Sequence, residues 1–210
     1  MSSSKSIVIS CAGIGSRLGL AKTKALININ GRSLIAWQLE LLKDIDDIRI
    51  VVGFQANDVI DEVRKIRKDI IFVYNHNYFD TKTAASYWLG ARDANDFVIE
   101  LDGDLIIHPD DMKMLLQQDG EWIAYADKLS SDAVYCSVND ELLVTSFHRE
   151  VGDFEWTGPC CLKREHIQYS SGNVYNQLEP WLPMRGIKVR ARDIDTYEDY
   201  KCVLQFMKKW

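Results

Sequence analysis

The sequence lacks the features that mark membrane, nucleic-acid-binding and disulfide-stabilised proteins. No apolar run approaches the roughly 20 residues that a membrane-spanning helix requires. The 31 acidic residues outnumber the 25 Lys and Arg, and a net charge of −6 disfavours general binding to nucleic acid or anionic membranes. The five cysteines are odd in number and have no Cys-x-x-Cys spacing, which argues against a disulfide framework. We therefore expect a cytoplasmic protein that binds neither nucleic acid nor membrane.

Metal-binding histidine patterns and domain linkers are also missing. The four histidines show no ligand spacing, so a zinc site is not expected. No linker, repeat or low-complexity segment interrupts the chain, and hydrophobic residues make up 47 % of its 210 residues. That share is enough to bury a sizeable core. We predict one domain over residues 1–210.

The first half of the chain alternates short apolar runs with segments of helical spacing. Strands are predicted at 6–10, 48–54, 69–75 and 96–102. Helices are predicted at 33–43, 56–68 and 83–94. This order, with strands that are apolar almost throughout, is typical of a parallel sheet covered by helices on both faces.

The second half of the chain has shorter strands divided by polar turns. We predict strands at 122–127, 133–138, 142–148 and 187–195, and helices at 108–118 and 196–210. Thr196 is the expected N-cap of the last helix, with Asp199 three residues later. The predicted fold is a Rossmann-like three-layer α/β/α arrangement. Its sheet is mixed but mainly parallel, with a smaller antiparallel addition in the second half.

The turn after the first predicted strand is rich in glycine and is followed by cations. It reads G-I-G-S-R-L-G over 13–19, with Lys22 and Lys24 beyond it. Glycines let the backbone approach an anion closely and direct N–H groups at it, and the cations suit a polyphosphate. Leu18 stands where a dinucleotide-binding fingerprint needs glycine, and the P-loop spacing is absent. An ordinary glycine turn with a solvated loop is the alternative.

Two acidic pairs lie at or near the carboxyl ends of predicted strands. They are D-G-D at 102–104 and D-I-D at 193–195. Paired carboxylates suit a hard cation such as Mg²⁺, which keeps several waters and shares phosphate oxygens. A polar turn and a simple helix cap are the respective alternatives. Taken together, the glycine loop, the cations and the acidic pairs predict a site for a nucleoside triphosphate and Mg²⁺.

These motifs resemble the signature of the nucleotidyltransferases related to sugar-1-phosphate nucleotidylyltransferases, which include the MobA-like NTP transferases. Residues 12–19, 24–26 and 29–35 resemble its A-A-G-x-G-S-R-L-G, P-K-x-L and G-K-P-L-I segments. Residues 103–104 fall at its metal-binding G-D, and 193–200 resemble its D-I-D-T-P-E-D-Y/L segment. A closer resemblance is to small bacterial members that activate phosphocholine-like acceptors with CTP. It is carried by Asn75, Tyr78, Thr81, Ser86, Trp88, Leu89 and Trp156-Thr157-Gly158.

The sequence departs from the family pattern at three places. Thr23 replaces the proline of P-K, which removes a rigid restraint beside Lys24. Lys82 and Thr83 replace paired asparagines, which puts contacts to the base or acceptor there in doubt. Cys11 replaces the first alanine of A-A-G, and we interpret it as a packing residue rather than a reactive thiol.

The resemblance implies a Mg²⁺-dependent nucleotidylyltransferase. It would transfer CMP from CTP to a small phosphorylated acceptor such as phosphocholine and release pyrophosphate, for cell-surface polysaccharide or lipid decoration. By resemblance, the catalytic residues are Arg17 and Lys24. The implied nucleotide-binding residues are Ser10, Cys11, Ala12, Gly13, Gly15, Ser16, Thr81, Thr83, Ser86 and Asp102. The implied metal ligands are Asp104, Asp195 and Asp193, with Asp102 as a further candidate, and the acceptor-binding candidates are Tyr78, Trp88, Glu155 and Trp156.

Three other functions are compatible with parts of the pattern. A sugar-1-phosphate nucleotidylyltransferase would use the same mechanism with a polar acceptor. A GT-A-type glycosyltransferase would use the D-G-D pair as its metal motif but has no need of the glycine loop with Lys24. A non-catalytic nucleotide sensor would bind the triphosphate without releasing pyrophosphate. The acceptor, the preferred base and the oligomeric state, a homodimer included, stay open.

Overall fold

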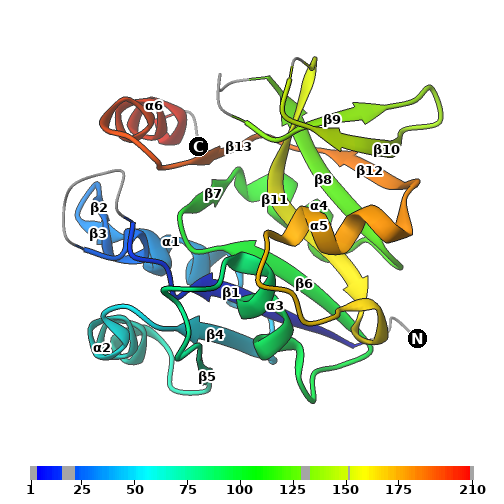
Figure 1. Cartoon of the computed structure of the whole chain (residues 1–210). Coiled ribbons are helices and arrows are strands. Elements are labelled where there is room, and N and C mark those ends of the chain that lie inside the picture. Colours follow the sequence, from blue (N-terminus) through cyan, green and yellow to red (C-terminus); the bar gives the residue numbers. More distant parts are fainter. Residues whose placement is uncertain (1–3, 16–21, 129–132, 151, 209–210) are drawn as a thin grey trace.

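The centre of the protein is a nine-stranded mixed sheet, seen in a computed structural model that describes residues 4–15, 22–128, 133–150 and 152–208 (Figure 1). The strand order is β5-β4-β1-β6-β11-β8-β12-β10-β9. In chain order these strands are β1 (Lys5–Cys11), β4 (Ile48–Val52), β5 (Ile71–Tyr74), β6 (Phe97–Asp102), β8 (Trp122–Asp127), β9 (Tyr135–Val138), β10 (Leu143–His148), β11 (Phe154–Lys163) and β12 (Met184–Lys188). Two small antiparallel sheets pair β2 (Asn28–Ile29) with β3 (Arg32–Ser33), and β7 (Leu105–Ile107) with β13 (Ala191–Asp193).

Strands β5, β4, β1 and β6 run parallel, as the alternation in the first half predicts. The connections between them are α1 (Leu34–Leu41), α2 (Ala56–Ile66) and α3 (Thr83–Ala91). The later helices are α4 (Pro109–Leu116), α5 (Val174–Leu178) and α6 (Tyr197–Met207), with 3₁₀ turns at η2 (Lys24–Leu26), η3 (Arg164–His166) and η4 (Glu179–Trp181). The α/β fold class predicted from the sequence is confirmed.

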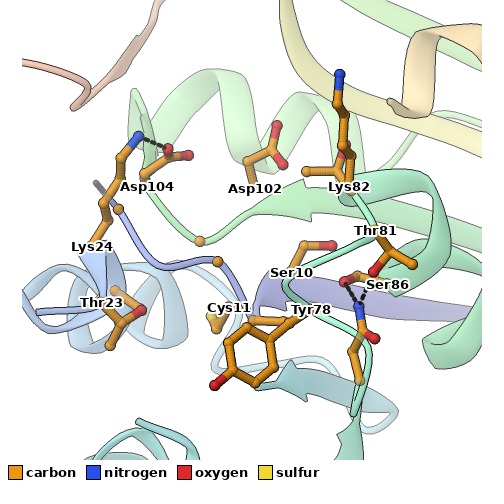
Figure 2. A pocket seen from close by; sticks show the side chains of 17 residues that line it. Ser10, Cys11, Thr23, Lys24, Tyr78, Thr81, Lys82, Ser86, Asp102 and Asp104 are labelled. Carbon is orange, nitrogen blue, oxygen red and sulfur yellow. Dashed lines mark hydrogen bonds and ion pairs between the residues drawn. The ribbon is translucent and has the colours of Figure 1, made fainter. Parts of the chain in front are cut away.

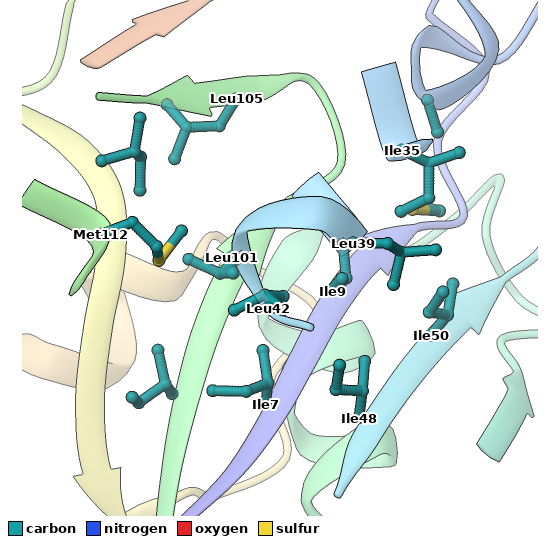
Figure 3. Close-up of a cluster of buried hydrophobic side chains, with 14 of the residues drawn as sticks. Ile7, Ile9, Ile35, Leu39, Leu42, Ile48, Ile50, Leu101, Leu105 and Met112 are labelled. Carbon is teal, nitrogen blue, oxygen red and sulfur yellow. The ribbon is translucent and has the colours of Figure 1, made fainter. Parts of the chain in front are cut away.

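Helices cover both faces of the sheet because its strands are apolar on both sides. One cluster packs α1, α2 and α4 against alternate strand residues; Figure 3 shows Ile7, Ile48 and Ile50 of the strands beside Leu39 and Leu42. The opposite face packs α3 and α5 against another set that includes Val8 and Val51. Residues 6–9 of β1 are therefore buried on both faces of the sheet.

Several elements differ from the sequence-based predictions: β2, β3, β7 and α5 are not predicted, and two further differences involve longer segments. The predicted strand 187–195 is two strands, β12 and β13, which belong to different sheets and are separated at Val189–Arg190. Arg190 donates to both carboxylate oxygens of Asp111 at 2.7 and 2.9 Å, which holds the chain at this break. The second difference is β11, a ten-residue strand that the pattern does not predict. Gly158 and Pro159 interrupt its pattern, and its register with β8 shifts between Trp156 and Cys160.

The cysteines are free thiols, as expected, and four of the five are buried. Burial raises the pKa of Cys136 and of Cys161 to about 12 and raises the pKa of Cys11, where the carboxylates of Asp104 and Asp102 add to the effect. Within the described part of the chain, no helix has the length and apolarity needed to cross a bilayer.

Cys202, which is exposed on α6, should be the first cysteine to react with iodoacetamide at neutral pH. The four buried thiols should be labelled only after unfolding, because the thiolate is the reactive form and burial suppresses it. Peptide mapping by mass spectrometry over a time course measures the order. Labelling of Cys11 as fast as Cys202 in the folded protein would contradict its assignment as a packing residue.

Candidate active site

A cavity opens at the carboxyl ends of β1 and β6, where an α/β sheet usually binds its ligand. We call it the first cavity, and Figure 2 shows the side chains that line it. Its walls come from the end of β1, from the start of η2, from the segment between β5 and α3, and from the end of β6. They include Ser10, Cys11, Ala12, Gly13, Gly15, Lys24, Asn75, Tyr78, Thr81, Thr83, Ser86, Asp102 and Asp104. Most of the residues predicted to bind nucleotide are thus brought together, whereas Ser16 and Arg17 lie outside the described residues.

The side chain of Asn75 forms hydrogen bonds that connect the residues of one wall of this cavity. Its buried amide donates to Thr81 Oγ1 at 3.0 Å and to Ser86 Oγ at 3.2 Å, and its Oδ1 accepts from the Asn77 amide. Asn75 carries part of the family resemblance but was not assigned to the site. Its position directly after β5 is the signal that would have placed it there.

The ammonium group of Lys24 lies between two carboxylates. Its Nζ is 2.6 Å from Oδ2 of Asp104 (Figure 2) and also forms an ion pair with Asp195. Burial alone would lower the pKa of Lys24, but these two carboxylates outweigh it and the pKa is raised. Lys24 therefore stays a cation, held where three segments distant in sequence meet.

Asp195 reaches this position through the small sheet of β7 and β13. Asp193 pairs with Leu105 across that sheet, and the amide of Ile194 donates to the carbonyl of Asp104 at 3.1 Å. Thr196 then caps α6, with its hydroxyl accepting from the Asp199 amide, as the sequence predicts. The helix cap is compatible with a role for Asp195 in the site, because the cap fixes where β13 ends and α6 begins.

Two further carboxylates crowd the same region. Burial, and then the charge of Asp104, raises the pKa of Asp102 to about 8, although Lys24 opposes the shift. Burial, and then Asp104 and Asp195, raises the pKa of Asp193 to about 7. Carboxylates packed at this density favour the binding of an additional cation.

A second cavity adjoins the first, and Thr83, Asp102 and Asp104 line both. Its other walls are formed by β11, by the segment around α5 and by β13 with the start of α6. They include Arg149, Glu155, Trp156, Thr157, Gly158, Asn173, Tyr175, Arg192, Asp193, Asp195 and Asp199. Lys24, Asp104 and Asp195 therefore lie at the junction of two cavities.

The predicted acceptor residues fall in different places. Glu155 and Trp156 line the second cavity, where the Trp156 and Tyr175 rings are 6.0 Å apart. Tyr78 lines the first cavity instead. Trp88 lines neither of the two cavities; its ring packs edge-on against Tyr169 at 5.2 Å.

Gly103 and Gly158 have a steric role at the site that the sequence motifs do not predict. A side chain at Gly103 would meet the Ser10 carbonyl oxygen at 2.7 Å, so only glycine lets β6 turn this close to β1. Gly158, with φ of +103°, leaves room for the Asp102 carboxylate, which a Cβ atom there would meet at 2.7 Å. Both glycines stand next to motifs that the sequence does show, D-G-D and W-T-G.

The chain matches a known protein family. Residues 7–167 match the family described as the MobA-like NTP transferase domain, which is more than half of the chain. The chain belongs to this family. Its members are nucleotidyltransferases, so the activity class implied by the family resemblance is confirmed.

Two curated proteins resemble the chain over part of their length. The choline-phosphate cytidylyltransferase of Streptococcus pneumoniae is 35 % identical over 106 residues, which cover 47 % of this chain and 44 % of that protein. The bifunctional protein GlmU of Sulfurimonas denitrificans is 28 % identical over 134 residues, 62 % of this chain and 30 % of that protein. The chain thus matches less than half the length of these curated relatives.

Solved structures share the fold of this chain over nearly its whole length. The CTP:phosphocholine cytidylyltransferase from Streptococcus pneumoniae superposes with a TM-score of 0.79 at 19 % identity, covering 97 % of this chain and 99 % of the other. The inositol-1-phosphate CTP transferase from T. maritima superposes with a TM-score of 0.84 at 16 % identity, covering 99 % and 96 %. At these identities the likeness establishes the fold.

The donor atoms of the site suit Mg²⁺. Across the described ranges, no three His, Cys, Asp or Glu side chains are grouped as a metal site by themselves. Mg²⁺ does not require three, because one or two carboxylates, waters and phosphate oxygens complete its shell. Asp104 and Asp195 both contact the single Lys24 ammonium, so their oxygens already converge on a cation.

Proposed function

We propose that this protein is a Mg²⁺-dependent cytidylyltransferase that transfers CMP from CTP to a small phosphorylated acceptor such as phosphocholine. The observation that carries the proposal is the position of Lys24, Asp104 and Asp195 at the junction of two cavities. The first cavity would take the nucleotide and the second the acceptor. Similarity to choline-phosphate cytidylyltransferase supports the choice of CTP and of a phosphocholine-like acceptor. The product would serve cell-surface polysaccharide or lipid decoration, and the free buried thiols suit a reducing cytoplasm.

The reaction needs positioning and charge neutralisation more than proton transfer. A phosphate oxygen of the acceptor attacks the α-phosphorus of CTP in line, the bond to the bridging oxygen breaks, and pyrophosphate leaves with that electron pair. The attacking phosphate is already ionised, so no general base is required. Mg²⁺ held by Asp104 and Asp195 would neutralise charge on the phosphate oxygens. Lys24 would stabilise the charge that develops at the α-phosphate.

The second cavity suits an acceptor with a positively charged end. Its lining contains the buried carboxylate of Glu155 and the rings of Trp156 and Tyr175. A carboxylate and aromatic rings are the groups that attract a substituted ammonium. The lining also includes Arg149 and Asn173, which would suit the hydroxyls and phosphate of a sugar 1-phosphate. The sugar-1-phosphate nucleotidylyltransferase is therefore the second candidate.

Pyrophosphate release tests both candidates. The four nucleoside triphosphates are crossed, with Mg²⁺, against phosphocholine, phosphoethanolamine, glycerol phosphate and several sugar 1-phosphates. Release with CTP and one small phosphate ester supports the proposal, and release only with a sugar 1-phosphate supports the second candidate. Thermal stabilisation by CTP with no release from any pair would contradict the proposal and favour a sensor.

A further inference from the structure

The segment that carries Lys24 is tied to the turn between β4 and α2. The backbone amide of Thr23 donates to the side-chain oxygen Oε1 of Gln55 at 2.8 Å, across 32 positions of sequence. Thr23 is only 2 % exposed, so water cannot readily replace Gln55 as the hydrogen-bond acceptor of its amide. Removing that acceptor therefore costs more free energy than it would at a solvated amide. The next residue is Lys24, whose ammonium lies between Asp104 and Asp195.

The turn that contains Gln55 is itself bound to Ala12, the residue that precedes the glycine loop. The amide of Phe54 donates to the carbonyl of Ala12 at 3.0 Å, and a Cβ atom at Gly53 would meet that carbonyl at 2.9 Å. Gln55 has φ of 51° and ψ of 38°, a left-handed conformation that is strained for an L residue other than glycine. Glycine would relieve this strain, yet the position holds a residue with a long amide side chain.

We propose that Gln55 is a positioning residue, which sets the reach of Lys24 toward the α-phosphate by holding the Thr23 amide. This inference rests on the proposed function, which assigns Lys24 to that phosphate. A displacement of about 1 Å in a group that acts in the transition state lowers the rate without unfolding the protein. Gln55 lines neither of the two cavities, so its effect passes through Thr23.

The backbone of Thr23 makes the inference testable by a second substitution. Thr23 has φ of −61° and ψ of 138°, which a proline adopts without strain. A proline there would fix φ covalently and would have no N–H for Gln55 to accept. Proline at 23 and glutamine at 55 are therefore two alternative ways to restrain the same segment.

The central experiment compares four variants by steady-state pyrophosphate release. Gln55→Gly should lower kcat about tenfold with little change in Tm, because the relief of the left-handed strain offsets the loss of the hydrogen bond to the Thr23 amide. Gln55→Glu keeps an acceptor oxygen and should retain most of the activity. Thr23→Pro combined with Gln55→Gly should recover kcat to within about threefold of the unmodified protein. Thr23→Ala combined with Gln55→Gly should stay slow, because alanine has no ring.

Amide hydrogen exchange supplies a readout that needs no substrate. The Thr23 amide should exchange at least about tenfold faster in Gln55→Gly than in the unmodified protein, while amides in β1 keep their protection. An unchanged Thr23 exchange rate would overturn the inference. So would a kcat within twofold of the unmodified enzyme in Gln55→Gly, or a failure of Thr23→Pro to restore it.

The same data separate this inference from the proposed function. If the unmodified protein releases no pyrophosphate with any pair, the proposed function fails and the role of Lys24 with it. Faster Thr23 exchange in Gln55→Gly would then still establish the restraint on the Lys24 segment. If the unmodified protein is active and Gln55→Gly is equally active, only the positioning role is overturned.

Discussion

Replacing Lys24 by alanine is expected to lower kcat for nucleotidyl transfer by about 10³, the loss usually seen when a preorganised charge is removed from a developing anion. The ammonium contacts Asp104 and Asp195 at the junction of the two cavities. The effect should appear mainly in kcat, because the charge that Lys24 stabilises grows in the transition state. Stopped-flow or coupled assays of pyrophosphate release give kcat and KM separately.

Two controls accompany this prediction: the stability of the Lys24→Ala protein, and the activity of a variant at an exposed lysine. Loss of Lys24 leaves two carboxylates without their common cation. Removing one partner of a fully buried pair costs about 3–5 kcal/mol, and water screens these partly exposed side chains, so the free energy of unfolding should fall by only about 1–2 kcal/mol. That change leaves the protein folded at 25 °C, which circular dichroism checks. Lys65→Ala removes an exposed lysine on α2 that pairs with Glu62 and should keep the original kcat. A Lys24→Ala enzyme with more than a tenth of the original kcat would contradict the assignment.

Asp104→Asn is expected to reduce kcat/KM by about a thousandfold, on the order of 4 kcal/mol of transition-state stabilisation. Asparagine keeps the shape of the side chain but removes the charge that would hold Mg²⁺ and that now pairs with Lys24. The Mg²⁺ concentration needed for half-maximal rate should rise as well, which separates loss of the metal ligand from loss of the lysine partner. The measurement is a Mg²⁺ titration of the initial rate at saturating CTP.

A variant of a second aspartate serves as the control for the change in net charge and for correct folding. Asp127→Asn removes an exposed carboxylate at the end of β8 that pairs with Lys188, so it changes the net charge equally. Its Mg²⁺ dependence should match that of the unmodified protein. An Asp104→Asn enzyme with a normal Mg²⁺ requirement would exclude Asp104 as the metal ligand and leave Asp195 as the remaining member of the pair.

The sequence by itself determined the elements that local chemistry governs. The apolar runs around β1, β4 and β6 and the helical spacing of α1, α2 and α3 predict the parallel half of the sheet. The cap of α6 by Thr196 and Asp199 was also predictable, because both partners lie within one turn. The glycine loop and the two acidic pairs indicated a site at the strand ends, because parallel strands present their carboxyl ends at one edge.

Only the tertiary structure decided which of these groups meet. Lys24 and Asp195 are 171 positions apart, and their contact depends on how β13 pairs with β7 and not on any local pattern. Strand β11 escaped prediction because its shifted register breaks the alternation that a regular strand would show. The tie from Thr23 to Gln55 has no sequence signal either, since the acceptor lies in a turn whose left-handed backbone the composition does not predict. Secondary-structure propensity acts over a few neighbouring residues. The geometry of the site depends instead on contacts between residues that are distant in sequence and meet only when the sheet is assembled.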